Sequence, residues 1–94
     1  MNLLVEDNPA RRRFEILADD SLAGHIAYQI ESGTIVLVHT EVDARFEGQG
    51  VGSALARGAL DQLRERGDRV RVTCPFLLHF IERHPEYASV VTDA

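Results

Sequence analysis

The residues with the clearest chemical meaning form a short glycine-rich loop. Glycines stand at alternate positions, Gly48, Gly50 and Gly52, and a helix-forming run follows directly. Glycine lets a ligand approach the backbone closely, and the first turn of a helix carries unpaired N–H groups at the positive end of its dipole. Together these features predict a cradle for a phosphate or a pyrophosphate group.

Two other phosphate-binding motifs do not fit this loop. The dinucleotide fingerprint Gly-x-Gly-x-x-Gly has a different spacing, and the phosphate loop Gly-x-x-x-x-Gly-Lys-Ser/Thr needs a lysine, a residue that this chain lacks throughout. A glycine-rich turn that merely enters a helix stays open as an alternative. The sequence around the loop must therefore decide between them.

Size and charge restrict the function classes. We expect one domain, spanning residues 1–94. The net charge of −5 argues against nucleic acid as a partner, because neutralising phosphates needs a basic surface. No stretch approaches the ~20 apolar residues of a membrane span, and the N-terminus lacks the basic start of a secretory signal. We therefore expect a cytoplasmic protein without a membrane partner.

The elements that position the loop follow from hydrophobic periodicity. Strands are expected at 12–18, 24–30, 34–42 and 69–73, and helices at about 50–66 and from Pro75 to just before Pro85. The first three strands should pair antiparallel, and the fourth should lie parallel to the third because a helix crosses between them. The fold class is thus α+β with α/β-type layers, in the order β-β-β-α-β-α.

Burial is expected at positions that share a face. The second strand should bury Ile26, Tyr28 and Ile30 on one face. Residues 35–38 are apolar on both faces, so we expect the third strand to be central and covered on both sides. The buried stripe of the second helix is expected to comprise Phe76, Leu77, Phe80 and Ile81.

Four sequence pieces in this order resemble a known family. They are His39-Thr40-Glu41-Val42, Gly48–Leu55, Cys74-Pro75-Phe76 and His84-Pro85-Glu86-Tyr87. Their order and spacing resemble the GNAT superfamily of acetyl-CoA-dependent N-acetyltransferases, and more narrowly its small branch, which lacks the usual N-terminal helices. The resemblance implies a reduced GNAT-like fold and transfer of an acyl group, with acetyl-CoA as the expected donor, to an amine.

The resemblance also implies where CoA would lie. The pyrophosphate would meet the N–H groups of Gln49, Gly50, Val51, Gly52 and Ser53. The pantetheine arm would run between the third and fourth strands, and the N–H of Val42 would polarise the thioester carbonyl. The family's loop motif, Gln/Arg-x-x-Gly-x-Gly/Ala, has Glu47 at its Gln/Arg position in this chain. Because a carboxylate repels a pyrophosphate, we expect Glu47 to point outward.

Acetyl transfer needs an ammonium to lose a proton, a thioester carbonyl to be polarised and a leaving thiolate to be captured. His39 and Glu41 are candidates for the proton, since residues two apart on a strand share a face unless a bulge intervenes. Each has a structural alternative. His39 could be satisfied by a neighbouring strand, and Glu41 could be an exposed carboxylate at the entry to the loop.

Two further residues are candidates for handling the thiolate. Cys74 lies at the end of a strand and before a helix N-terminus, a position that favours a reactive thiolate. It could accept the acyl group or donate a proton, and an inert buried thiol is the open alternative. The superfamily often uses a tyrosine near its last helix as the acid, which points to Tyr87. This tyrosine follows Pro85, so packing with its hydroxyl at the surface is its alternative role.

The remaining expectations concern metals, acceptors and partners. A single cysteine excludes an internal disulfide, and no histidine–carboxylate pair has metal-ligand spacing, so no metal is expected. Without N-terminal helices the acceptor site should be open, which suits a protein or peptide amine better than a small metabolite. We expect a monomer or a weak homodimer. A non-catalytic CoA-binding module and a small interaction protein remain alternative functions.

Overall fold

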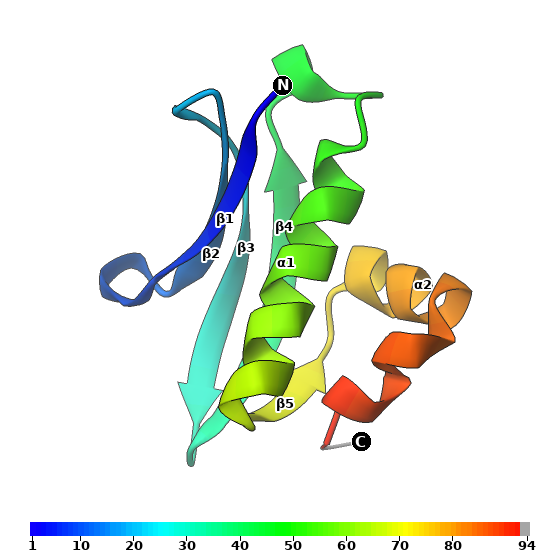
Figure 1. Ribbon diagram of the computed structural model, residues 1–94. Coiled ribbons are helices and arrows are strands. Elements are labelled where there is room, and N and C mark those ends of the chain that lie inside the picture. Colours follow the sequence, from blue (N-terminus) through cyan, green and yellow to red (C-terminus); the bar gives the residue numbers. More distant parts are fainter. Residues whose placement is uncertain (93–94) are drawn as a thin grey trace.

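The computed structural model describes residues 1–92 and shows a five-stranded sheet with two helices packed against it (Figure 1). The elements are β1 (Leu3–Asn8), β2 (Arg13–Ala18), β3 (Ser21–Glu31), β4 (Thr34–Val42), α1 (Val51–Arg66), β5 (Arg69–Val72) and α2 (Pro75–Arg83). Short 3-10 helices occupy Pro9–Arg11, Ala44–Phe46 and Pro85–Val90. The sheet order is β1-β2-β3-β4-β5. The first four strands pair antiparallel and β5 lies parallel to β4, which confirms the predicted pairing and fold class.

The edge strand β1 is absent from the predicted element order, which is therefore corrected to β-β-β-β-α-β-α. β1 pairs antiparallel with β2 along its whole length. Its side chains are exposed or half-buried throughout, because one edge and one face of this strand are open. A short edge strand of this kind gives only a weak alternating pattern in the sequence.

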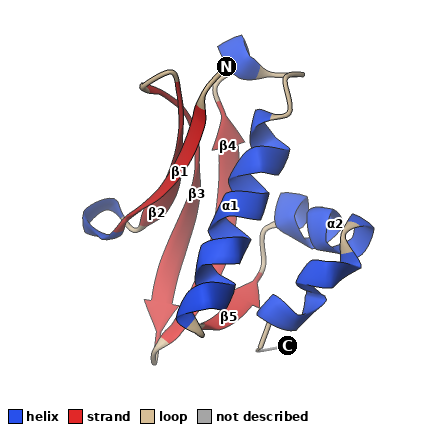
Figure 2. Ribbon diagram, in the orientation of Figure 1, coloured by secondary structure: helices blue, strands red, loops and turns tan. Residues whose placement is uncertain are grey.

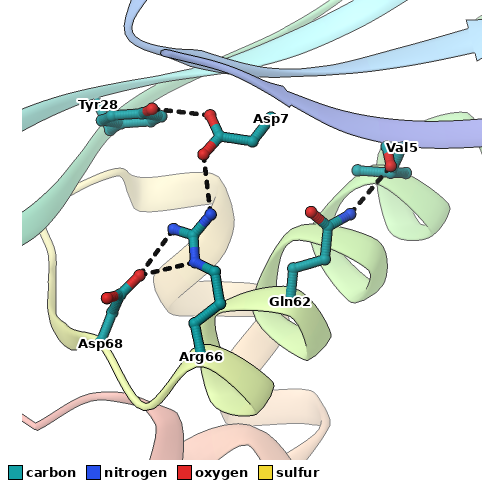
Figure 3. A network of polar contacts seen from close by, with 6 residues as sticks. All are labelled: Val5, Asp7, Tyr28, Gln62, Arg66 and Asp68. Carbon is teal, nitrogen blue, oxygen red and sulfur yellow. Dashed lines mark hydrogen bonds and ion pairs between the residues drawn. The ribbon is translucent and has the colours of Figure 1, made fainter.

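Polar contacts tie β1 to the rest of the fold (Figure 3). The Gln62 side chain on α1 donates to the Val5 carbonyl at 2.9 Å. The carboxylate of Asp7 accepts from the Tyr28 hydroxyl at 2.7 Å and from the Arg66 guanidinium at 2.9 Å. These contacts hold β1 to β3 and to the C-terminal half of α1.

Tight two-residue turns close both inner hairpins. Asp19 and Asp20 have φ of 47° and 71°, and Ser32 and Gly33 have φ of 51° and 82°. Two successive positive φ values are typical of the type I′ turn, whose twist matches that of the flanking strands. Both turns lie between the strands expected at 12–18, 24–30 and 34–42.

The core lies between one face of the sheet and the helices, which Figure 2 shows as a red sheet behind a blue helical layer. α1 buries six residues in this core, namely Val51, Leu55, Ala56, Ala59, Leu60 and Leu63. Ile30 is an error of the prediction, because its side chain is 47% exposed. It lies one residue pair before the β3–β4 turn, at the end of the sheet.

The expectation that β4 is covered on both sides holds at Val36 and Leu37, although helices pack on only one of the two faces. Leu37 lies in the core beneath the helices. Val36 points to the opposite face, where it is nevertheless only 2% exposed. Its neighbours there in the strand register are Gln29 and Arg71, and Arg71 forms an ion pair with Glu31. Neighbouring side chains of the sheet, rather than a second helical layer, cover Val36.

Candidate active site

A gap opens where β4 and β5 separate. Their pairing ends at Leu37 and Val72. The N–H groups of Thr73 and Cys74 then both donate to the Leu37 carbonyl, at 3.0 and 3.2 Å, as the chain turns into α2. β4 continues to Val42, and beyond Leu37 no described strand pairs with the edge of β4 that faces away from β3. The gap therefore lies along the last residues of β4, next to the start of α1.

Two backbone N–H groups of β4 face this gap. The N–H of Asp43 donates to the Ala23 carbonyl on β3 at 2.8 Å, and successive N–H groups of a strand point to alternate sides. Because the register is regular over this end of β4, Val42 and Thr40 direct their N–H groups away from β3. This is the orientation that the role predicted for Val42 requires, and Thr40 shares it.

The glycine loop forms one wall of a pocket beside the gap. The pocket has a volume of about 260 Å³ and is lined by Val42, Phe46, Glu47, Gly48, Gly50, Val51, Gly52, Ser53 and Phe76; we call it the loop pocket. Gly50 is the N-cap of α1, with a φ of 77°, and no side chain caps this helix. The first N–H groups of α1 therefore remain available to an anion.

Gly52 brings three elements close together at the loop pocket. A Cβ at this position would lie 3.2 Å from the Phe76 ring and 3.6 Å from the Val42 side chain. Phe76 was expected to be buried, but its side chain is 42% exposed, whereas Leu77 is fully buried. The first turn of α2 thus presents Phe76 to the pocket rather than to the core.

The predicted CoA-binding residues are largely brought together here. The pocket is lined by Gly50, Val51, Gly52 and Ser53. Gln49 does not line it, and its side chain donates to the Arg45 carbonyl at 3.2 Å. Glu47 was expected to point outward; it is exposed and is one of the residues that line the pocket. A carboxylate beside the expected phosphate position weakens the attraction of the loop for an anion.

The predicted pair His39 and Glu41 does share a face. The irregularity in the β3–β4 register falls before His39, so the two residues keep their alternation. Both are exposed on the sheet face away from α1, which we call the open face. The Glu41 carboxylate lies 3.8 Å from Nε2 of His25, and the ring centroids of His25 and His39 are 6.4 Å apart. His25 was not among the predicted site residues.

Cys74 lies beside the gap and below the surface. Its sulfur is 3.3 Å from the Thr40 hydroxyl oxygen, and the residue is 2% exposed. It is the N-cap of α2, although its side chain caps no N–H group. The thiol is therefore close to the N–H groups of β4 that face the gap, but it is covered by its neighbours.

Tyr87 lies apart from the other predicted site residues. Its hydroxyl donates to Asp61 on α1 at 2.9 Å, so it does not reach the surface as its alternative role required. Burial, followed by this hydrogen bond to Asp61, raises the pKa of Tyr87. Asp61 is roughly 13 Å of helix beyond Gly52. This placement gives no support to Tyr87 as a proton donor near the gap.

Comparison with known proteins gives the same assignment as the fold. A family model described as GCN5-related N-acetyl-transferase matches residues 13–90. The chain belongs to this family. It is 30% identical to Protein NATD1 of Danio rerio over 89 residues, which cover 90% of this chain and 81% of that protein. It is 32% identical to Protein NATD1 of Bos taurus over 83 residues, covering 86% and 74%.

A solved structure of a GCN5-related protein shares the whole architecture. The NMR structure of a GCN5-like protein from Staphylococcus aureus superposes with a TM-score of 0.68 at 26% identity. The match covers 96% of this chain and 88% of that chain. The GCN5-related fold is therefore shown over nearly the whole of this chain.

Metal and membrane features are also informative. In the described part of the chain, no group of three or more His, Cys, Asp or Glu residues is placed to hold a metal ion. No helix among residues 1–92 is long and apolar enough to cross a membrane.

Proposed function

We propose that this protein is an acyl-CoA-dependent N-acyltransferase, with acetyl-CoA as the donor and an amine as the acceptor. One observation carries the proposal. The uncapped start of α1 at Gly50 adjoins a stretch of β4 whose N–H groups, at Thr40 and Val42, face a gap left by β5. Membership of the GCN5-related family supports the same reading.

Each part of the gap has a role in this reaction. The first N–H groups of α1 bind the pyrophosphate, because they are unpaired and lie at the positive end of the helix dipole. The N–H groups of β4 stabilise the negative charge that develops on the thioester oxygen. Cys74, whose sulfur is hydrogen-bonded to the Thr40 hydroxyl, is the nearest candidate to return a proton to the leaving thiolate.

Isothermal titration with acetyl-CoA tests the proposal. We expect saturable binding at micromolar to low-millimolar affinity, lost in Gly50→Glu because the new carboxylate occupies the phosphate position. Gly67→Glu is the matched control, since Gly67 also has a positive φ, of 70°, but lies at the other end of α1. CoA release in the presence of a panel of amines then measures transfer. No binding of any CoA species would overturn the proposal.

A second candidate is a protein that binds CoA without transferring an acyl group. Glu47 favours it, because an acidic residue lines the loop pocket at the position where the family motif has Gln or Arg. The burial of Cys74 favours it too. Acetyl-CoA binding without amine-dependent CoA release over the whole panel would support this candidate over the enzyme.

A further inference from the structure

A second pocket meets the loop pocket at Val42. It has a volume of about 410 Å³ and is lined by Leu22, Ala23, Gly24, His25, Glu41, Val42, Asp43 and Ala44. His25 and Glu41 place it on the open face, so we call it the open-face pocket. Val42, whose N–H faces the gap, lies in the lining of both pockets. A molecule in the open-face pocket would thus lie beside the strand at which the thioester is expected.

The charge of the open-face pocket suits a cation. Its lining has two carboxylates and neither lysine nor arginine. The Asp43 carboxylate is already paired, because the Arg45 side chain contacts it at 3.1 and 3.2 Å, and these contacts lower the pKa of Asp43. Glu41 keeps 65% of its side chain exposed, and the nearest ring nitrogen of His25, Nε2, is 3.8 Å from its carboxylate. Glu41 is therefore the carboxylate free to attract a cation.

The surroundings of His25 favour its neutral imidazole, the form that can accept a proton. Burial, then the charge of Arg13, lower the pKa of His25 from its ordinary value of 6.5, and the ring of His39 acts in the same direction. Glu41 on β4 and Glu15 on β2 oppose this shift. Arg13 itself is paired with Glu15 at 2.6 Å. Burial and Arg13 together favour the neutral imidazole, and its Nε2 lies 3.8 Å from the Glu41 carboxylate.

We propose that the open-face pocket binds the acceptor of the reaction, a primary ammonium group on a short apolar chain. Glu41 attracts the cation, His25 takes its proton, and Leu22 and Ala44 contact the carbon chain. Leu22 is available for this contact because its side chain is 41% exposed. A lysine side chain and a peptide amino terminus both have this chemistry. The inference rests on the proposed N-acyltransferase function.

The proton and electron movements balance without another reactant. The ammonium gives one proton to the unprotonated ring nitrogen of His25, and the freed amine attacks the thioester carbonyl carbon. A C–N bond forms and the C–S bond breaks, so the sulfur leaves with the bonding electron pair. The second amine proton passes to the CoA thiolate, and the imidazolium returns its proton to solvent. The products are an amide, CoA thiol and one released proton.

NMR titration in the absence of acetyl-CoA tests the binding step. n-Butylamine represents the lysine side chain and alanine amide represents the amino terminus, so the two arms separate these sources. We expect at least one probe to shift the His25 ring and Gly24 amide signals saturably, with affinity roughly fivefold weaker in Glu41→Gln. Glu65→Gln, which removes the same charge on the outer face of α1, is the control. No response to either probe, or unchanged affinity in Glu41→Gln, would overturn the inference.

The pH dependence of CoA release tests the role of His25. With the better of the two probes as acceptor, we expect His25→Asn to lower the rate at pH 7 by about a hundredfold. The rise in rate with pH should move upward, toward the pKa of the amine itself, while affinity for acetyl-CoA is unchanged. A merely structural role for His25 would lower the rate at every pH. A profile that moves in His39→Asn and not in His25→Asn would overturn the assignment.

The two proposals can fail separately. If the unaltered protein does not bind acetyl-CoA, the N-acyltransferase function falls, and amine binding is still measured by NMR. If acetyl-CoA binds and neither amine perturbs His25, only the assignment of the open-face pocket falls.

Discussion

The hydroxyl oxygen of Thr40 lies 3.3 Å from the sulfur of Cys74, and this contact joins the end of β4 to the start of α2 beyond the last residue of β5. It places the thiol against the side chain of Thr40, while the N–H of Thr40 faces the gap. Removing the thiol should therefore leave the backbone groups that hold a thioester in place.

We expect Cys74→Ala to lower the free energy of unfolding by about 1 kcal/mol, because it removes one buried hydrogen bond and leaves a small cavity. Its affinity for acetyl-CoA should stay within about twofold of the original, since backbone groups make that interaction. Denaturant unfolding and titration calorimetry check both values. Slower CoA release at saturating acetyl-CoA would make Cys74 a proton donor, and unaltered release would make it a packing residue.

Glu47→Gln should tighten CoA binding several-fold at low salt, because it removes a negative charge from the lining of the loop pocket. The gain should shrink as salt is added, since the side chain is exposed and its charge is screened. Titration calorimetry at two salt concentrations measures this, with Glu65→Gln as a control of equal charge change. Equal affinities for the two variants at low salt would mean that Glu47 turns away from the bound anion.

A third pocket adjoins the loop pocket on the side of α2. It has a volume of about 290 Å³ and is lined by Ser53, Phe76, His79, Phe80, Arg83 and His84. Ser53 and Phe76 belong to both pockets. Arg83 makes no ion pair with any of the residues 1–92. It is therefore a candidate to meet the 3′-phosphate of CoA.

Arg83→Ala should weaken binding of CoA by about tenfold, the expected loss of a charge-assisted phosphate contact. Binding of 3′-dephospho-CoA should not change, because that ligand lacks the phosphate in question. Arg11→Ala, in the 3-10 helix after β1, controls for the loss of one positive charge. The measurement is calorimetry with both ligands, and an equal loss for both would place the 3′-phosphate elsewhere.

The register of β3 and β4 shows what the sequence could not give. Counting back from the turn pair Glu31–Thr34 places Thr40 opposite His25. An irregularity at Ala27 and Tyr28 shifts the register by one residue, so that Glu41 lies opposite His25 instead. A bulge inserts one extra residue into one strand, and counting from the turn alone does not reveal where it falls. Of the open-face residues His25, His39 and Glu41, the sequence therefore predicted the two on β4 and missed His25 on β3.

Elements with strong periodicity were predicted well, and contacts between distant segments were not. α1 was placed within one residue of its observed start, because its apolar stripe and the glycines at both ends mark it clearly. Tyr87 was assigned to the site because of its order in the chain. Its direction is instead set by the 3-10 helix Pro85–Val90, which turns the ring back onto α1 and toward Asp61.

The packing of β1 on α1 depends on a glycine. A Cβ at Gly58 would lie 2.6 Å from the Val5 side chain, a distance that requires the strand to move. We expect Gly58→Val to lower the free energy of unfolding by about 1–3 kcal/mol, the usual cost of overpacking. Val5→Ala in the same chain should recover part of this loss. A double-mutant cycle by denaturant unfolding measures the coupling, and additive effects would mean that the two residues do not press on each other.

The contact between Tyr28 and Asp7 should make stability depend on alkaline pH. Burial, then the hydrogen bond to Asp7, raise the pKa of Tyr28 from 10.0 to about 12. A group whose folded pKa is raised favours the folded state while it is protonated, so its contribution is complete below pH 10 and is lost as the pH rises toward 12. The free energy of unfolding should therefore fall by about 2 kcal/mol across this window.

Tyr28→Phe isolates this contribution. Below pH 10 the variant should be less stable by about 1 kcal/mol, because Asp7 loses a hydrogen-bond donor while keeping its ion pair with Arg66. Its stability should then fall less steeply in alkali, with the remaining decline due to Tyr87, whose pKa is raised as well. Urea unfolding at several pH values between 8 and 12 measures both effects. Parallel pH profiles for the variant and the unaltered protein would show that the Tyr28 hydroxyl titrates as it does in the unfolded chain.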